Sequence, residues 1–125
     1  MGRVAMALDL AAVLLFVGIG RAVHTDGASM AGFASTAWPF VSGLAFGWLA
    51  VLAGGLLVEA LVSGLVVVVA TVALGMTFRV VSGQGTALAF VLVAIGFLGA
   101  EMLGWRALAM VFRQPRSTSG EPGDR

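Results

Sequence analysis

Two arginines and the single histidine of this chain are the residues best suited to binding a small charged molecule. Arg21 and His24 are three residues apart and share one helical face if the preceding helix continues, while Arg79 ends a later apolar segment. Guanidinium groups form charge-assisted hydrogen bonds to phosphate and carboxylate oxygens, including those of lipid head groups. We therefore predict a site for an anion, a lipid head group or a partner's carboxylate. This outer cluster consists of Arg21, His24, Thr36, Trp38, Arg79, Gln84 and Thr86.

The outer cluster has an alternative interpretation that involves no ligand. Its residues lie near the expected ends of apolar segments, where Arg and Trp side chains reach the interface between membrane and water. Thr86 could equally cap the first turn of the helix that follows it. A binding role and an anchoring role both remain open.

A second set of charged residues lies inside the apolar segments: Asp9, Glu101 and Arg106. An ionisable side chain at membrane depth costs roughly 2.5–3.5 kcal/mol, so each needs a physical reason. We expect Asp9 to pair with Arg106 across two helices and so to fix their packing. Two acids compete for this one base, which leaves a second hypothesis: Asp9 or Glu101 carries a proton or a cation.

The composition argues against most enzymes and metal proteins. The chain has no cysteine and one histidine, which excludes thiolate sites and, within one chain, a multi-histidine metal site. It lacks a nucleophile elbow, a phosphate loop and an HExxH motif. We predict no enzyme, no cofactor and no metal; a lipid-head-group enzyme using His24 with Asp26 or Arg21 is the least favoured class. A few arginines do not make a nucleic-acid surface.

The elements that must position these residues are four apolar runs. The chain is 60% hydrophobic with a mean hydropathy of +1.07, and a helix needs roughly 17–25 apolar residues to cross a membrane. We predict an all-α integral membrane bundle of four transmembrane helices, with Pro39 in the first turn of the second. The spans are about 4–20, 39–58, 61–78 and 87–105, within one domain, 1–112, followed by a disordered polar tail, 113–125.

The connections and the arginines predict the topology. Only Glu59 and Ala60 separate the second and third spans, which indicates a tight antiparallel hairpin. Arginines are enriched in cytoplasmic segments. Four spans place Arg21 and Arg79 on one side and the other arginines, Arg3, Arg106, Arg113, Arg116 and Arg125, on the opposite side. We therefore expect a multi-pass protein of the cell (plasma) membrane with both termini in the cytoplasm.

Glycines at helical spacing indicate where helices approach closely. Gly43 and Gly47 form a GxxxG pair, a pattern that lets membrane helices pack backbone to backbone. Similar pairs occur at Thr71 and Gly75 and, in the last span, at Gly96 and Ala100. Besides the lipid bilayer, the partner that we expect is a second copy of the chain, bound through Gly43 and Gly47.

Several short strings together resemble a known family. They are Gly20-Arg21 with His24, Thr36-Ala37-Trp38-Pro39-Phe40, Gly47-Trp48, Gly75-Met76 with Arg79, Gly83-Gln84-Gly85-Thr86-Ala87 and Gly104-Trp105-Arg106. The chain up to about Arg106 resembles the small prokaryotic membrane proteins catalogued as domain of unknown function three-zero-five-four. The resemblance implies four helices and a membrane location, and it implies no activity.

The polar residues and the apolar segments together suggest two functions. The first is a small transporter, permeation unit or ligand-binding protein whose polar site lies near the outer membrane face. The alternative is an accessory or scaffold subunit of a larger membrane complex.

Overall fold

The structure, a computed structural model of the chain, describes residues 2–23 and 30–112. They form four α-helices and their connections: α1 (Gly2–Val23), α2 (Met30–Ala53), α3 (Leu61–Val81) and α4 (Leu88–Phe112). Each helix is long and apolar enough to cross a membrane, and neither range contains a β-strand. The predicted all-α bundle of four membrane-spanning helices is confirmed. The tail predicted to be disordered, 113–125, lies outside the described residues.

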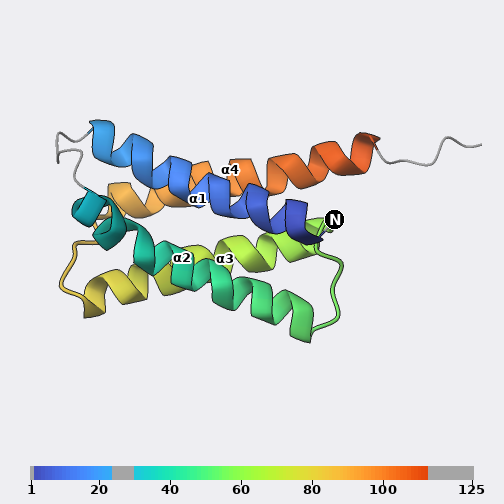
Figure 1. Cartoon of the computed structure of the whole chain (residues 1–125), viewed down its shortest axis with the longest axis horizontal. Helices are drawn as coiled ribbons and strands as arrows, with labels where there is room; N and C mark the ends of the chain where they lie inside the picture. Colours follow the sequence, from blue (N-terminus) through green and yellow to red (C-terminus); the bar gives the residue numbers. More distant parts are fainter. Residues whose placement is uncertain (1, 24–29, 113–125) are drawn as a thin grey trace, which may run out of the picture.

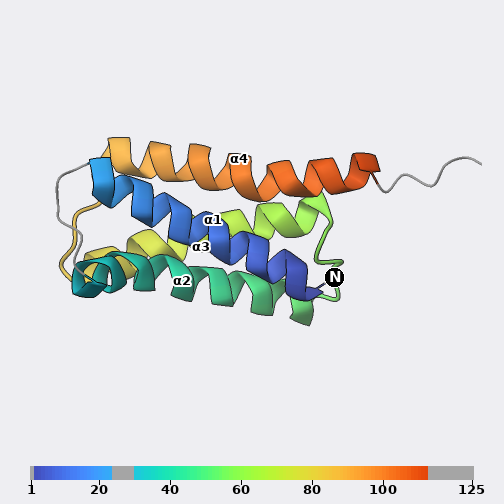
Figure 2. The same cartoon turned by 45° about the horizontal axis from the view of Figure 1, so that its top comes forward.

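The helices run alternately up and down along one long axis (Figure 1). α1 packs against α2 and α4, and α3 packs against the same two helices. The start of α1, the α2–α3 connection and the end of α4 lie together at what we call the terminal end (Figure 2). The end of α1, the start of α2 and the α3–α4 connection lie at the opposite end, the loop end. The ring of four helices therefore has two distinct ends at which polar residues can gather.

The second helix starts earlier than the sequence predicted. α2 begins at Met30, and Pro39 lies inside it rather than in its first turn. A proline inside a helix removes one backbone hydrogen bond, but neighbouring membrane helices make such an interruption tolerable. Here the proline is buried against the rest of the bundle. Burial of its ring and the apolar surroundings explain why the helix continues through it.

The second helix also ends earlier, at Ala53 rather than at residue 58. Gly55 has a φ of +69°, and the Leu56 N–H donates to the Val51 carbonyl at 3.0 Å. A left-handed glycine with this hydrogen bond is a Schellman motif, which ends a helix. The predicted two-residue hairpin at Glu59 and Ala60 is therefore wrong: residues 54–60 form the connection.

The remaining helices extend beyond their predicted spans. α1 continues to Val23, α3 to Val81 and α4 to Phe112. Hydropathy alone marks the apolar part of a helix, whereas hydrogen bonding carries the helix into the interfacial region beyond it. This extension brings Arg21 and Arg79 into the last turns of their helices.

Glycines set the close approach of α2 and α3. A Cβ added to Gly43 would lie 3.0 Å from the carbonyl oxygens of Ala70 and Thr71, and one added to Gly47 would lie 3.1 Å from Val67 Cα. Both glycines are buried against α3 of the same chain. The GxxxG pair therefore packs helices within one chain, which corrects the expectation that it joins two copies. Self-association through another face stays a prediction.

The core between the four helices is apolar and partly aromatic. Phe40, Leu44, Leu98 and Met102 are fully buried within it. The Phe16 ring, from α1, lies edge-on to Phe40 with the ring centroids 5.5 Å apart. Phe16 also contacts two rings of α4, those of Phe90 and Phe97. This aromatic cluster therefore links α1, α2 and α4.

Candidate functional site

The described residues contain two polar centres, and the first is a buried ion pair. Arg106 Nη1 donates to Asp9 Oδ1 at 2.9 Å, and Nη2 donates to Oδ2 at 2.8 Å. Both side chains are 0% exposed. The paired geometry matches the planar guanidinium to the planar carboxylate, which is the strong form of this interaction. The predicted pairing of Asp9 with Arg106 is confirmed.

Both members of this pair make further hydrogen bonds. Trp48 Nε1 donates to Asp9 Oδ2 at 3.0 Å, and Trp105 Nε1 donates to Oδ1 at 2.9 Å. Arg106 also donates from Nε to the Val58 carbonyl and from Nη1 to the Met102 carbonyl, both at 3.0 Å. Each carboxylate oxygen therefore has two donors. The network ties α1, α2, α4 and the α2–α3 connection together, and its geometry favours a structural role over proton or cation transfer by Asp9.

Glu101 lies outside this network. Its side chain is exposed on α4, near the middle of that helix. Within residues 2–23 and 30–112 it makes no hydrogen bond or ion pair. The competition of two acids for one base is thus resolved: Asp9 holds Arg106, and Glu101 faces outward.

The second polar centre is at the loop end and is organised by Arg79. Gly83, with a φ of +81°, ends α3, and the Gln84 N–H donates to the Arg79 carbonyl at 2.7 Å. This Schellman turn places Gln84 and Gly85 beside the arginine. Arg79 Nε donates to the Gly85 carbonyl and Nη1 to Gln84 Oε1, both at 2.9 Å. The guanidinium also lies over the Phe90 ring, 4.5 Å from its centroid.

Arg21, in the last turn of α1, is also at the loop end and is hydrogen-bonded to α2. Its Nη1 donates to Thr36 Oγ1 at 3.0 Å, and that hydroxyl donates to the Gly32 carbonyl at 3.0 Å. Gln84 Nε2 donates to the Ser35 carbonyl at 3.1 Å, which joins the α3–α4 connection to α2. The hydrogen bonds therefore join α1 to α2, and they join α2 and α3 to the α3–α4 connection.

These residues surround one hollow, the loop-end cavity, of about 740 Å³. Its polar lining includes Arg21, Thr36, Arg79 and Gln84; its apolar lining includes Phe16, Val17, Phe90 and Val93. The described lining carries two arginines and no carboxylate. A volume of this size is within the roughly 300–1,000 Å³ of pockets that enclose small ligands. The arrangement suits an anionic group attached to an apolar body.

The cavity contains some residues of the predicted outer cluster and omits others. Trp38 stacks on Phe78, with ring centroids 5.8 Å apart, and lies outside the cavity lining. Thr86 is also outside the lining, and α4 begins after it, at Leu88. His24, together with Asp26, lies outside the described residues.

Sequence reasoning missed the apolar half of the cavity. Phe16 and Phe90 read as ordinary residues of apolar spans, because nothing in a hydropathy pattern separates a cavity wall from a lipid-facing ring. Ser35 was missed because its contribution is a backbone carbonyl. For metals, the described part of the chain holds no group of three or more His, Cys, Asp or Glu side chains that could bind an ion.

The fold and the two polar centres define an all-α, four-helix membrane bundle with a buried ion pair and a cationic cavity. Residues 6–109 match the family described as "Protein of unknown function (DUF3054)". The chain belongs to this family, as its short strings had indicated. No curated protein and no solved structure matches the chain.

Proposed function

We propose that this protein is a non-enzymatic membrane protein that binds a small anion with an apolar body in the loop-end cavity. It would serve as a ligand-binding unit, or as a transporter or permeation unit that moves this ligand. The cavity supplies the two features that such a ligand needs, because its lining contains the cations of Arg21 and Arg79 and the aromatic rings of Phe16 and Phe90.

The observation that carries this proposal is that the described residues supply no acidic partner for Arg79. Its hydrogen-bond partners, the Gly85 carbonyl and Gln84 Oε1, are both neutral. No acidic partner faces it among the described residues, and its Nη2 makes no hydrogen bond to them. A guanidinium has five N–H donors, so donors remain for a ligand. A half-buried positive charge held by neutral groups favours an incoming anion.

The test is the binding of decyl phosphate to the protein in phosphatidylcholine nanodiscs, with empty nanodiscs as the blank. Arg79→Gln removes the charge and should weaken binding about tenfold, because a charge-assisted contact of this kind is worth on the order of 1.4 kcal/mol. Arg79→Lys should retain part of the affinity. Arg3→Gln is the matched control, since Arg3 is an exposed arginine at the terminal end. Equal affinities of wild type and Arg79→Gln would remove the support for this site.

A second candidate function, a subunit of a larger membrane complex, rests on Glu101. A carboxylate that faces hydrocarbon without a partner is unfavourable, and a partner helix that offers a donor would relieve it. A partner recovered in mild detergent with wild type and lost with Glu101→Gln would support this function. Recovery of the chain alone would remove its support.

We also propose the plasma membrane as the location, with both termini in the cytoplasm. The support comes from the sequence: three arginines, Arg113, Arg116 and Arg125, follow α4 in the chain, and arginines are enriched in cytoplasmic segments. The loop-end cavity would then open toward the outer face.

A further inference from the structure

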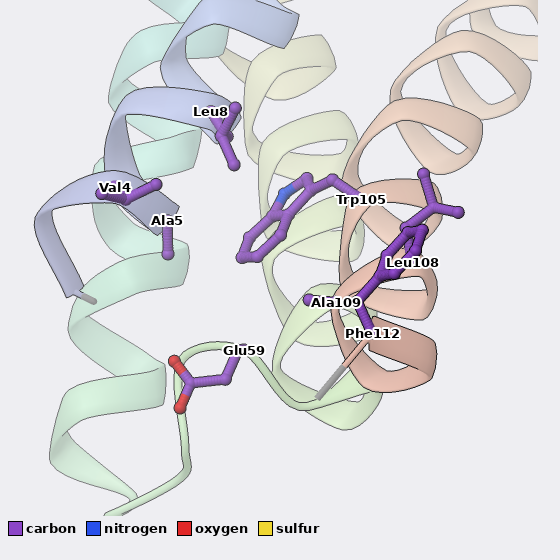
Figure 3. A pocket seen from close by; sticks show the side chains of 8 residues that line it. All are labelled: Val4, Ala5, Leu8, Glu59, Trp105, Leu108, Ala109 and Phe112. Carbon is purple, nitrogen blue, oxygen red and sulfur yellow. The ribbon is translucent and has the colours of Figure 1, made fainter. Parts of the chain in front are cut away.

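A second concave surface lies at the terminal end, away from the loop-end cavity. This terminal groove has a volume of about 230 Å³ and runs between the first turns of α1 and the last turns of α4 (Figure 3). Val4 and Leu8 line it from α1, and Trp105, Leu108 and Phe112 line it from α4. Glu59, from the α2–α3 connection, is the one acidic residue of its lining.

The Glu59 carboxylate has no partner within the described ranges. Figure 3 shows its side chain below the Trp105 ring, with the carboxylate directed toward the α1 side of the groove. The side chain is half-buried, whereas Asp9 nearby is fully buried and receives four donors. A half-buried carboxylate beside apolar walls and without a donor of its own favours a ligand that carries a positive charge.

The groove is open toward the lipid-facing surface of the bundle. Leu8 is 41% exposed, Leu108 59% and Phe112 82%, so the apolar walls continue onto the outside of α1 and α4. The volume is also below the roughly 300–1,000 Å³ typical of pockets that enclose a compact ligand. These two features fit a flexible alkyl chain that enters from the side.

We propose that the terminal groove binds a phospholipid whose head group ends in a primary ammonium. One acyl chain lies against Leu8, Trp105 and Leu108, and the ammonium donates charge-assisted hydrogen bonds to Glu59. A water-soluble amine would satisfy Glu59 alone and leave the apolar walls without a ligand. This inference is independent of the proposed function, because its residues belong to the opposite end of the bundle.

The experiment is native mass spectrometry of the protein in a neutral detergent. The probes are phosphatidylethanolamine and phosphatidylglycerol with identical palmitoyl and oleoyl chains, added in equal amounts. We expect phosphatidylethanolamine adducts to be retained preferentially. Glu59→Gln should lower their retention about five- to tenfold while leaving the phosphatidylglycerol adducts unchanged. Leu8→Trp, which fills the groove, should lower the retention of phosphatidylethanolamine even though it keeps the carboxylate.

The matched control is Glu101→Gln, which removes a carboxylate that also lacks a partner but lies outside the groove. It should leave both adducts unchanged. Equal retention of phosphatidylethanolamine by wild type and Glu59→Gln would overturn the proposal. Displacement of the lipid by free ethanolamine, or a dimer in place of the lipid adduct, would overturn it as well.

Discussion

At the scale of single residues, the central feature is one pair of opposite charges, Asp9 and Arg106, buried between the helices. Asp9 and Arg106 are 0% exposed, and together with Trp48, Trp105 and two backbone carbonyls they satisfy their polar atoms. A buried ion pair contributes little net stability against an apolar replacement, but the loss of one partner leaves an uncompensated charge. The pair therefore specifies how the helices meet more than it strengthens the bundle.

This balance predicts the behaviour of variants of the pair. Arg106→Met should lower the free energy of unfolding by about 3–5 kcal/mol, because it leaves Asp9 charged and buried. The double variant Asp9→Leu with Arg106→Met should recover most of that loss. Unfolding in a titration with sodium dodecyl sulfate, followed by circular dichroism, measures both. Glu101→Gln, an exposed change on the same helix, is the control, and a neutral Arg106→Met would contradict the assigned role of the pair.

The sequence predicted the pairing of Asp9 with Arg106 but not the other partners of these two residues. The similar depths of Asp9 and Arg106 in two apolar segments were enough to pair them. Trp48 and Trp105 were not assigned to Asp9, because an indole in a membrane span is equally compatible with packing against apolar neighbours. The Val58 carbonyl was also missed, since residue 58 was expected in a helix, where its carbonyl would accept a backbone hydrogen bond.

At the scale of elements, glycines decide where helices touch and where they end. Gly64 and Gly75 of α3 lie against other helices: an added Cβ would meet Arg106 Cδ at 2.7 Å and Phe40 Cδ1 at 2.7 Å, respectively. Gly96 of α4 has no neighbouring atom within 4 Å of such a Cβ. The same residue type therefore has a packing role on α3 and none within the bundle at Gly96 of α4.

This difference gives an element-scale prediction. Gly43→Val should destabilise the bundle by about 1–3 kcal/mol, because the new side chain meets the backbone of α3. Gly96→Val is the matched control and should change the free energy of unfolding by less than about 0.5 kcal/mol, as expected of an open site. Both variants can be followed by thermal unfolding in one detergent. Equal stabilities would mean that α2 and α3 do not pack at the observed distance.

The helix ends show where sequence-based prediction stops for elements. Hydropathy located four spans, but α2 was displaced because Pro39 was read as a start signal. Its burial by neighbouring helices, which only the tertiary structure provides, lets the helix continue. Gly54 and Gly55 indicate the end of α2, but the apolar residues that follow them were included in the predicted span.

At the scale of the whole molecule, the bundle separates a cationic cavity from an apolar groove with one acid. The loop-end cavity is lined by Arg21 and Arg79, and the terminal groove contains Glu59. Trp105, which lines the groove, donates a hydrogen bond to Asp9 of the buried ion pair and so joins α4 to α1. No sequence pattern predicts either hollow, because both depend on which apolar side chains leave space between helices.

The two ends can be assigned to membrane sides by labelling single cysteines. The natural chain has none, so Gly2→Cys and Ser82→Cys each give one thiol, at the terminal end and at the loop end respectively. A charged maleimide applied to intact cells should label Ser82→Cys and should label Gly2→Cys only after permeabilisation. The reverse pattern would place the termini outside.

The most direct test of the central claim is a crystal structure, grown in a lipidic phase, with a decyl phosphate that carries bromine at the end of its chain. We expect the phosphate within hydrogen-bonding distance of Arg79 and the anomalous bromine signal near Phe16 and Phe90. The Arg79→Gln variant should show neither. A ligand bound elsewhere on the bundle, with the loop-end cavity unoccupied, would contradict the assignment of this cavity as an anion-binding site.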